Sequence, residues 1–174
     1  MERYAMGLDF GTNSCRSLIL NLGSGREVAS HVFDYPSGER GVWISDRDPN
    51  LARQNPADYL DGLEAVMVQA IVKARDAEHG FEPERIIGIG VDTTGSTPIP
   101  VDRDGTPLAL TPRFRDNPDA AAWLWKDHTS HAEARLITMR ARDVRPHYLA
   151  TCGGTYSSEW FWSKIWHCLR QSPD

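Results

Sequence analysis

The stretch LDFGTNSCRSLIL, residues 8 to 20, constrains the fold more than any other part of this 174-residue chain. An apolar segment ends there at Asp9, passes through a short turn rich in Gly, Thr, Asn and Ser, and resumes at once as a second apolar segment. Two strands joined by so short a connection are expected to be antiparallel neighbours. A third apolar segment follows a Gly-Ser-Gly turn, so the sequence predicts a β-meander with strands at residues 4–9, 15–21 and 27–33.

The pattern after the meander predicts helices packed against a sheet. Residues 34–55 are polar and contain many turn formers, which predicts a long loop. Asn55 and Pro56 suit the start of a helix, and apolar residues recur at helical spacing until about residue 79. The continuous apolar run at 86–91 predicts a central strand covered on both faces. An extended segment with a turn at 96–110 and helices at 130–142 and 157–171 complete a mixed sheet flanked by helices, an α/β or α+β architecture.

The turn that follows Asp9 combines a carboxylate with groups that donate hydrogen bonds. Turn amides and hydroxyls suit phosphate oxygens, and a carboxylate suits Mg²⁺, which neutralises charge during phosphoryl transfer. The alternative is a plain hairpin with good turn residues, and Arg16 is then a structural ion-pair partner. The stretch matches neither the Gly-Lys-Ser/Thr phosphate loop nor the Gly-x-Gly-x-x-Gly dinucleotide motif. The candidate phosphate-binding residues are Gly11, Thr12, Asn13 and Ser14.

A second polar segment, GIGVDTTGSTPIP at residues 88 to 100, also follows an apolar strand. Asp92 ends that strand as Asp9 ends the first, and ligands of open α/β sheets bind at the carboxyl ends of strands. The hydroxyl of Thr94 and the bare main chain at Gly95 suit a polyhydroxylated ligand. The alternative is a strand-end turn capped by Asp92.

The last third of the chain carries two further candidates, Asp127 in LWKDHT and Lys164 in YSSEWFWSK. Tryptophans cluster around them and could form the wall of a sugar pocket, although aromatic residues at this density more often serve packing. A lysine near a helix usually extends its amine to solvent. The His-x-x-His spacing at His128 and His131 has no paired Cys-x-x-Cys, so a metal site there is disfavoured.

Composition excludes several classes of function. The net charge of −5 argues against binding to nucleic acid or to an anionic membrane, which both need a basic surface. No apolar run is long enough to span a bilayer, and the first residues lack a signal peptide, which predicts a cytoplasmic protein. Three widely spaced cysteines fit free thiols in a reducing compartment.

In their order along the chain and in their residues, these motifs resemble those of the FGGY family of carbohydrate kinases, and most of all its members that phosphorylate ribulose. GLDFGTNSCRSLILN resembles the family's first phosphate motif, and IGIGVDTTGSTPIPVDRDGTPLAL, LWKDHT and CGGTYSSEWFWSKI resemble segments around the sugar. The resemblance implies an actin-like, ribonuclease-H-like α/β fold, with a three-stranded meander followed by parallel strands. It implies transfer of the γ-phosphoryl group of ATP to a hydroxyl of a ketopentose, giving ribulose 5-phosphate, and a place in arabinose catabolism.

The resemblance also implies roles for individual residues. Asp9 would bind Mg²⁺ through water, residues 11–14 would contact the γ-phosphate, and Arg16 would help to hold its charge. On the sugar side it assigns Asp92, Thr94, Gly95, Asp127 and Lys164.

One departure affects every role. Members of the family are considerably longer, and their catalytic base and adenosine pocket would lie beyond residue 174, in a second, nucleotide-binding domain. The sequence therefore predicts the N-terminal, sugar-binding domain of a kinase, inactive alone and a homo-oligomer when full length. A kinase for xylulose or ribitol, or a non-catalytic actin-like binding module, remains an alternative.

Overall fold

The computed structural model describes residues 2–173 and divides into two compact units. The first unit contains Met1–Gly41 and Ala57–Thr94, and the second contains Val42–Pro56 and Gly95–Asp174. Each unit has its own sheet and its own helices, so each is described by itself.

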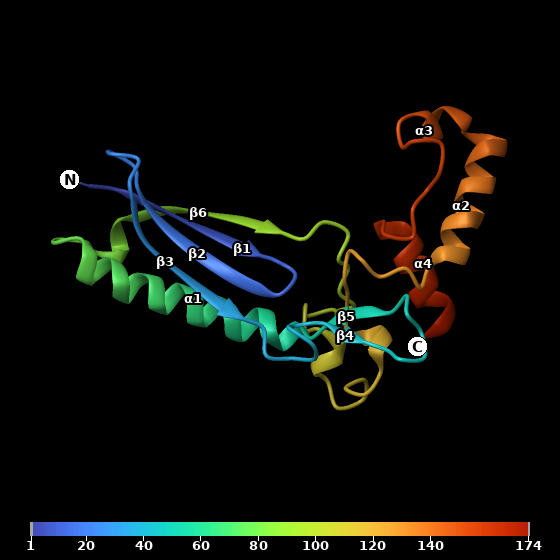
Figure 1. The fold of residues 1–174 in the computed structure, drawn as a ribbon, viewed down its shortest axis with the longest axis horizontal. Coiled ribbons are helices and arrows are strands. Elements are labelled where there is room, and N and C mark those ends of the chain that lie inside the picture. Colours follow the sequence, from blue (N-terminus) through green and yellow to red (C-terminus); the bar gives the residue numbers. More distant parts are fainter. Residues whose placement is uncertain (1, 174) are drawn as a thin grey trace. The chain divides into compact units, whose positions relative to one another are not determined.

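A four-stranded mixed sheet forms the centre of the first unit (Figure 1). Its strands are β1 (Tyr4–Phe10), β2 (Ser14–Asn21), β3 (Glu27–Asp34) and β6 (Ile86–Thr93), in the order β3-β2-β1-β6. The first three are antiparallel neighbours, and β6 pairs parallel to β1. The structure therefore confirms the predicted meander and the mixed sheet.

Helix α1 (Pro56–Ala77) covers one face of the meander strands. Proline fits the first turn of a helix, because the amide that it lacks would have no partner there, and Asp58 adds a favourable negative charge at the same end. Small or branched side chains recur every four residues along its buried face, which lets the helix lie close to the sheet. The core contains Val66, Ala70 and Ala74 of α1 with Tyr4, Met6, Leu8, Cys15, Ile19 and Val28 of the strands.

At Gly62, helix α1 lies close to the sheet. A Cβ atom at this position would lie 2.5 Å from Cys15 Sγ and 3.0 Å from Phe33 Cδ1. The absence of a side chain at Gly62 is therefore a packing requirement.

The prediction that residues 86–91 form a central strand covered on both faces is wrong for the described part of the chain. Strand β6 lies at the edge of the sheet, and Ile87, Ile89 and Val91 are each more than half exposed. The buried face of α1 packs on the meander strands, and no described helix covers β6. The apolar side chains of β6 make the strand suited to burial. Whether its faces are buried depends on which helices or strands pack against them.

The second unit contains a small antiparallel sheet of β4 (Trp43–Ile44), β5 (Ala52–Gln54) and β7 (Ala122–Trp123). Two of these strands lie within residues 34–55, which the sequence predicts as a loop without strands. Strands of two or three residues are too short to show an alternating pattern. The predicted turn within 96–110 is confirmed by the bridge between Val101 and Pro107.

Helices form most of the remaining second unit. These are α2 (His131–Val144), α3 (Pro146–Ala150) and α4 (Phe161–Gln171), with short 3₁₀ turns at Leu108–Leu110 and Pro118–Ala120; a third, Pro83–Arg85, precedes β6 in the first unit. The two predicted helices are confirmed, while the five residues of α3 are too few for a periodic pattern. No helix in residues 2–173 combines the length and apolarity that crossing a membrane requires.

Candidate functional site

Three charged side chains come together at the carboxyl ends of β1 and β6. Asp9 of β1 pairs in register with Arg16 of β2 on one side and with Asp92 of β6 on the other. Arg16 Nε lies 3.0 Å from Asp9 Oδ2, and the two side chains are 56% and 43% exposed. An ion pair this open to water contributes little stability, so both groups are available to a charged ligand. The pattern of two strands that each end on an aspartate thus places both carboxylates side by side.

A shallow hollow of about 410 Å³ extends from these side chains along the sheet. Gly7 and Gly90 lie in its floor, and a Cβ atom at either position would have no neighbour within 4 Å. At these two positions a ligand can approach the main chain closely, while Leu8, Leu18 and Val91 form an apolar part of the lining. Asp9, Arg16 and Asp92 line the same hollow.

The turn between β1 and β2 is closed by main-chain hydrogen bonds. Gly11 N donates to Ser14 O at 2.9 Å, and a Cβ atom on Gly11 would lie only 3.2 Å from that oxygen. Asn13 O accepts from Tyr35 N at 2.9 Å, and Asn13 Nδ2 donates to Arg40 O at 2.6 Å. The side chain of Asn13 thus ties the turn to the loop that follows β3. The structure brings the predicted residues from Gly11 to Ser14, Thr12 included, together beside Asp9.

The segment after β6 starts as a capped strand end. Asp92 Oδ1 accepts from Thr93 N at 3.0 Å, and Thr94 N donates to Phe10 O at 3.1 Å. The cap that the sequence offered as an alternative role for Asp92 is therefore present, and the hydrogen bond to Phe10 fixes Thr94 beside the end of β1. The first unit ends at Thr94, and the chain enters the second unit at Gly95.

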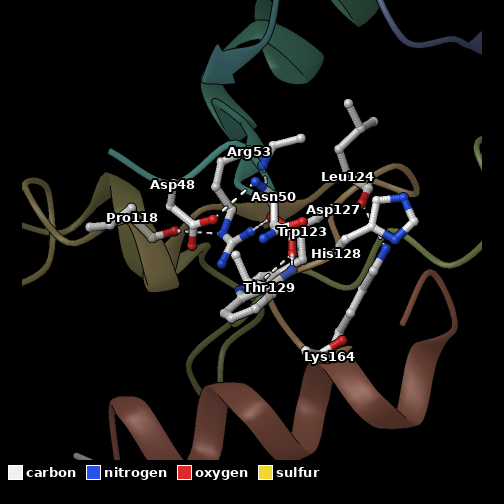
Figure 2. A network of polar contacts seen from close by, with 12 residues as sticks. Asp48, Asn50, Arg53, Pro118, Trp123, Leu124, Asp127, His128, Thr129 and Lys164 are labelled. Atoms are coloured by element: carbon white, nitrogen blue, oxygen red, sulfur yellow. Dashed lines mark hydrogen bonds and ion pairs between the residues drawn. The ribbon is translucent and has the colours of Figure 1, made fainter. Parts of the chain in front are cut away.

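Asp127 lies in a buried polar network of the second unit (Figure 2). One carboxylate oxygen accepts from Ala52 N at 2.7 Å and from the Arg53 guanidinium. The other accepts from Thr129 N at 3.1 Å and Thr129 Oγ1 at 2.6 Å. The guanidinium carbon of Arg53 lies 3.4 Å from the centroid of the Trp123 ring. In this structure Asp127 holds together strand β5 and the loop before α2.

Arg53 is a member of this network that no sequence motif predicts. It is buried, and burial lowers the pKa of its guanidinium to about 10 although acidic neighbours favour the charged form. Arg53 and Asp127 are separated by 74 positions, so neither local spacing nor a motif joins them.

Lys164 of α4 is fully buried, contrary to the usual preference of lysine for solvent. Its Nζ donates to three main-chain carbonyls, at 2.8 Å to Ser96, 2.6 Å to Leu124 and 3.1 Å to Trp125. Burial, and secondly the charge of Arg53, lower the pKa of the Lys164 ammonium to about 8. The ammonium thus ties α4 to the segment after Gly95 and to the loop that contains Asp127.

The predicted residues belong partly to the first unit and partly to the second. Asp9, residues 11–14, Arg16 and Asp92 gather in the first unit, while Asp127 and Lys164 hold one loop of the second unit through protein contacts. Within the described residues, no group of three or more His, Cys, Asp or Glu side chains is arranged to hold a metal ion.

The meander with a parallel fourth strand and flanking helices is an actin-like fold. Solved structures share the fold: xylulose kinase from Rhodospirillum rubrum, with a TM-score of 0.71 and 22% identity over 98% of this chain and 30% of that one, is similar. A Plasmodium falciparum glycerol kinase solved with ADP has a TM-score of 0.71 and 16% identity over 99% of this chain and 29% of that one. At these identities the likeness concerns the fold alone.

Residues 4–157 match the model of the N-terminal domain of the FGGY family of carbohydrate kinases, and the chain belongs to this family. It is 42% identical to ribulokinase of Vibrio parahaemolyticus over 164 residues, which is 94% of this chain and 28% of the relative. It is 38% identical to ribulokinase of Shouchella clausii over 178 residues, which is 100% of this chain and 31% of the relative. The family resemblance noted in the sequence is thus confirmed, and the chain spans under a third of the length of these curated relatives.

Proposed function

We propose that the protein containing this chain transfers the γ-phosphoryl group of ATP to a hydroxyl of ribulose, giving ribulose 5-phosphate. The turn from Gly11 to Ser14, with its candidate donors for phosphate oxygens, is called the phosphate-type turn. The observation that carries the proposal is that Asp9, just before this turn, pairs in register with Arg16 of β2 and with Asp92 of β6. The identity to two ribulokinases over almost the whole chain supports ribulose as the sugar. The greater length of these relatives supports a second, nucleotide-binding domain outside this chain.

Phosphoryl transfer is catalysed mainly by positioning and by stabilisation of charge on the phosphate oxygens. In the proposal the turn from Gly11 to Ser14 holds the terminal phosphate with its donors. Arg16, which is already oriented by Asp9, neutralises part of the phosphate charge. The catalytic base is not among the residues assigned here.

Asp9 fits a Mg²⁺ site bound through water, because its half-exposed carboxylate at the end of β1 offers oxygen atoms to the hydration shell of the ion. Mg²⁺ needs only one or two carboxylates when phosphate and water complete its shell. When bound, the ion would neutralise charge on the phosphate.

On the sugar side, we propose that Asp92, Thr94 and Gly95 contact hydroxyls and that Asp127 and Lys164 act as positioning residues. Their charged atoms bind Ala52, Thr129, Leu124 and Trp125, so they set the shape of the 124–129 loop. A place in arabinose catabolism, a cytoplasmic location and a homo-oligomeric full-length enzyme belong to the same proposal.

The test is ADP release, measured by a coupled assay, from the polypeptide extended beyond residue 174. L-ribulose, D-ribulose, D-xylulose, ribitol and glycerol are offered in parallel. Turnover that favours ribulose supports the proposal. Preference for xylulose or ribitol contradicts the choice of sugar, and absence of turnover on every sugar favours a non-catalytic actin-like binding module.

Asp9→Asn tests the phosphate side of the site. Because the substitution removes a charge but keeps the shape, we expect kcat to fall by about 100-fold or more while the sugar affinity stays within about twofold. Sugar affinity is measured by titration calorimetry on the same preparation. Unchanged kcat would exclude Asp9 from the reaction.

A further inference from the structure

The loop after β3 forms a second hollow beside the phosphate-type turn. This hollow, of about 420 Å³, is lined by Asn13, Asp34, Tyr35 and Arg40, all in the first unit. Asp34 ends β3 and pairs in register with Ser14 at the start of β2. The hollow therefore adjoins the residues that the proposed function assigns to the terminal phosphate.

Arg40 has an unusual main-chain conformation. Its φ of 50° lies in the left-handed region, between Gly38 at 57° and Gly41 at 84°. Glycine adopts such angles freely, whereas a side chain there is strained and persists only when its surroundings fix it. Ser96 is the other residue besides glycine with a positive φ in the described part of the chain.

Several contacts fix the loop around Arg40. Its carbonyl accepts from Asn13 Nδ2 at 2.6 Å, and Gly41 N donates to Ser37 O at 2.8 Å. Ser37 N and Oγ in turn donate to the Asp58 carboxylate of α1, at 3.1 and 2.7 Å. A Cβ atom on Gly41 would lie 2.6 Å from the Cβ atom of Tyr35, so the chain also packs tightly there. The backbone of Arg40 is thus held on two sides.

The guanidinium of Arg40 is in contrast uncommitted. Arg40 is exposed, and within residues 2–173 no carboxylate lies at ion-pair distance from it, Asp34 included. Arginine suits phosphate because its planar group of donors matches phosphate oxygens. A positive charge is therefore held by a fixed backbone at the edge of the phosphate-type turn.

We infer that Arg40 is a phosphate-binding residue, whose guanidinium binds the oxygens of the terminal phosphate of a nucleoside triphosphate held by the Gly11–Ser14 turn. This inference rests on the proposed function for the position of the phosphate. Asn13 supports it, because the side chain of a turn residue holds the carbonyl of Arg40 directly. Asp34 opposes anion binding in the same hollow, so its charge limits the affinity.

The test uses Arg40→Gly and Arg40→Lys in the polypeptide extended beyond residue 174. Glycine suits a φ of 50°, so Arg40→Gly keeps the loop conformation and removes only the side chain. We expect pyrophosphate and ATP to bind about tenfold more weakly, as loss of a charge-assisted hydrogen bond predicts, and Arg40→Lys to recover part of the affinity. Arg75→Ala, an exposed arginine on α1, is the matched control and should bind as the wild type does.

Asp34→Asn provides the test of opposite sign, since it should strengthen pyrophosphate binding while Arg40→Gly weakens it. Titration calorimetry with pyrophosphate requires no turnover, so its result is independent of whether the sugar is ribulose. Equal affinity of Arg40→Gly and wild type, or failure of the wild type to bind pyrophosphate, overturns the role of Arg40. Normal pyrophosphate binding with no turnover on any sugar overturns the proposed function alone.

Discussion

At the scale of single residues, Lys164 shows how a buried charge is accommodated. Its ammonium has three carbonyl partners and no carboxylate partner within ion-pair distance among the described residues. Carbonyl dipoles offset only part of the hydration that a charge loses, so burial lowers the pKa of Lys164 to about 8. The folded state therefore holds this proton less tightly than the unfolded chain does.

This difference predicts a pH-dependent contribution to stability. The penalty for the charged amine is complete below the folded pKa and is released as the pH rises toward the ordinary lysine value. Relative to Lys164→Met, the wild type should gain about 2 kcal/mol in the free energy of unfolding between about pH 7 and about pH 9.5. Urea denaturation of both proteins at each pH measures the difference, and the control is Lys126→Met, an exposed lysine on the loop that Lys164 contacts. A difference that does not change with pH would contradict the lowered pKa.

The charged residues also show which parts of the site could be predicted from sequence. Asp9 and Asp92 could be found, because a carboxylate directly after an apolar strand has a known position in a sheet. Arg53 could not be found, because its partner Asp127 is distant in sequence and their contact depends on the pairing of β5 with β7. The role of Arg40 depends on a main-chain angle, which composition does not report.

At the scale of elements, the packing of α1 on the meander depends on Gly62. Glycine inside a helix ordinarily costs about 0.5–1 kcal/mol relative to alanine. Here a methyl group would overlap Cys15 Sγ, and overpacking a core costs about 1–3 kcal/mol. The packing effect is larger than the propensity effect, so a side chain at this position is expected to lower the free energy of unfolding.

Gly62→Ala is accordingly expected to destabilise the protein by about 1–2 kcal/mol despite the better helix propensity of alanine. The double variant with Cys15→Ala should be less destabilised than the sum of the two single variants, because the methyl group can occupy the space left by the sulfur atom. Urea denaturation of the four proteins gives the coupling. A stabilised Gly62→Ala, or strict additivity, would show that the helix is free to move away from the sheet.

Long elements were predictable from the sequence and short ones were not. The meander and α1 have clear periods and recognisable ends, so they could be placed within a few residues. The two-residue and three-residue strands of the second unit and α3 have no period to detect. The coverage of β6 was not predictable, because it depends on elements distant from its own sequence.

At the scale of the whole molecule, both units expose apolar side chains within residues 2–173. On β6, Ile87, Ile89 and Val91 are exposed along an unpaired sheet edge, and on α4 so are Trp162 and Leu169. Exposed edge strands with apolar side chains promote association between chains.

The isolated 174-residue polypeptide is therefore expected to self-associate increasingly as its concentration is raised. Ile89→Lys places a charge on the edge strand and should shift the population toward monomer, as measured by analytical ultracentrifugation. Val68→Lys on α1 replaces another exposed apolar side chain by the same charge away from β6 and serves as the control. A monomeric wild type, or an equal effect of both variants, would contradict association through β6.

The contact between Gly62 and Cys15 has a further consequence for the chemistry of the thiols. Cys15 is buried, burial raises the pKa of its thiol, and the thiolate is the form that reacts with oxidants and alkylating agents. The sulfur atom occupies the space that a side chain at residue 62 would need, so an added oxygen or alkyl group has no room while α1 is in place. Cys152 and Cys168 are partly exposed. Alkylation of Cys15 therefore reports the separation of α1 from the sheet, which makes this thiol a native probe for the opening of the first unit.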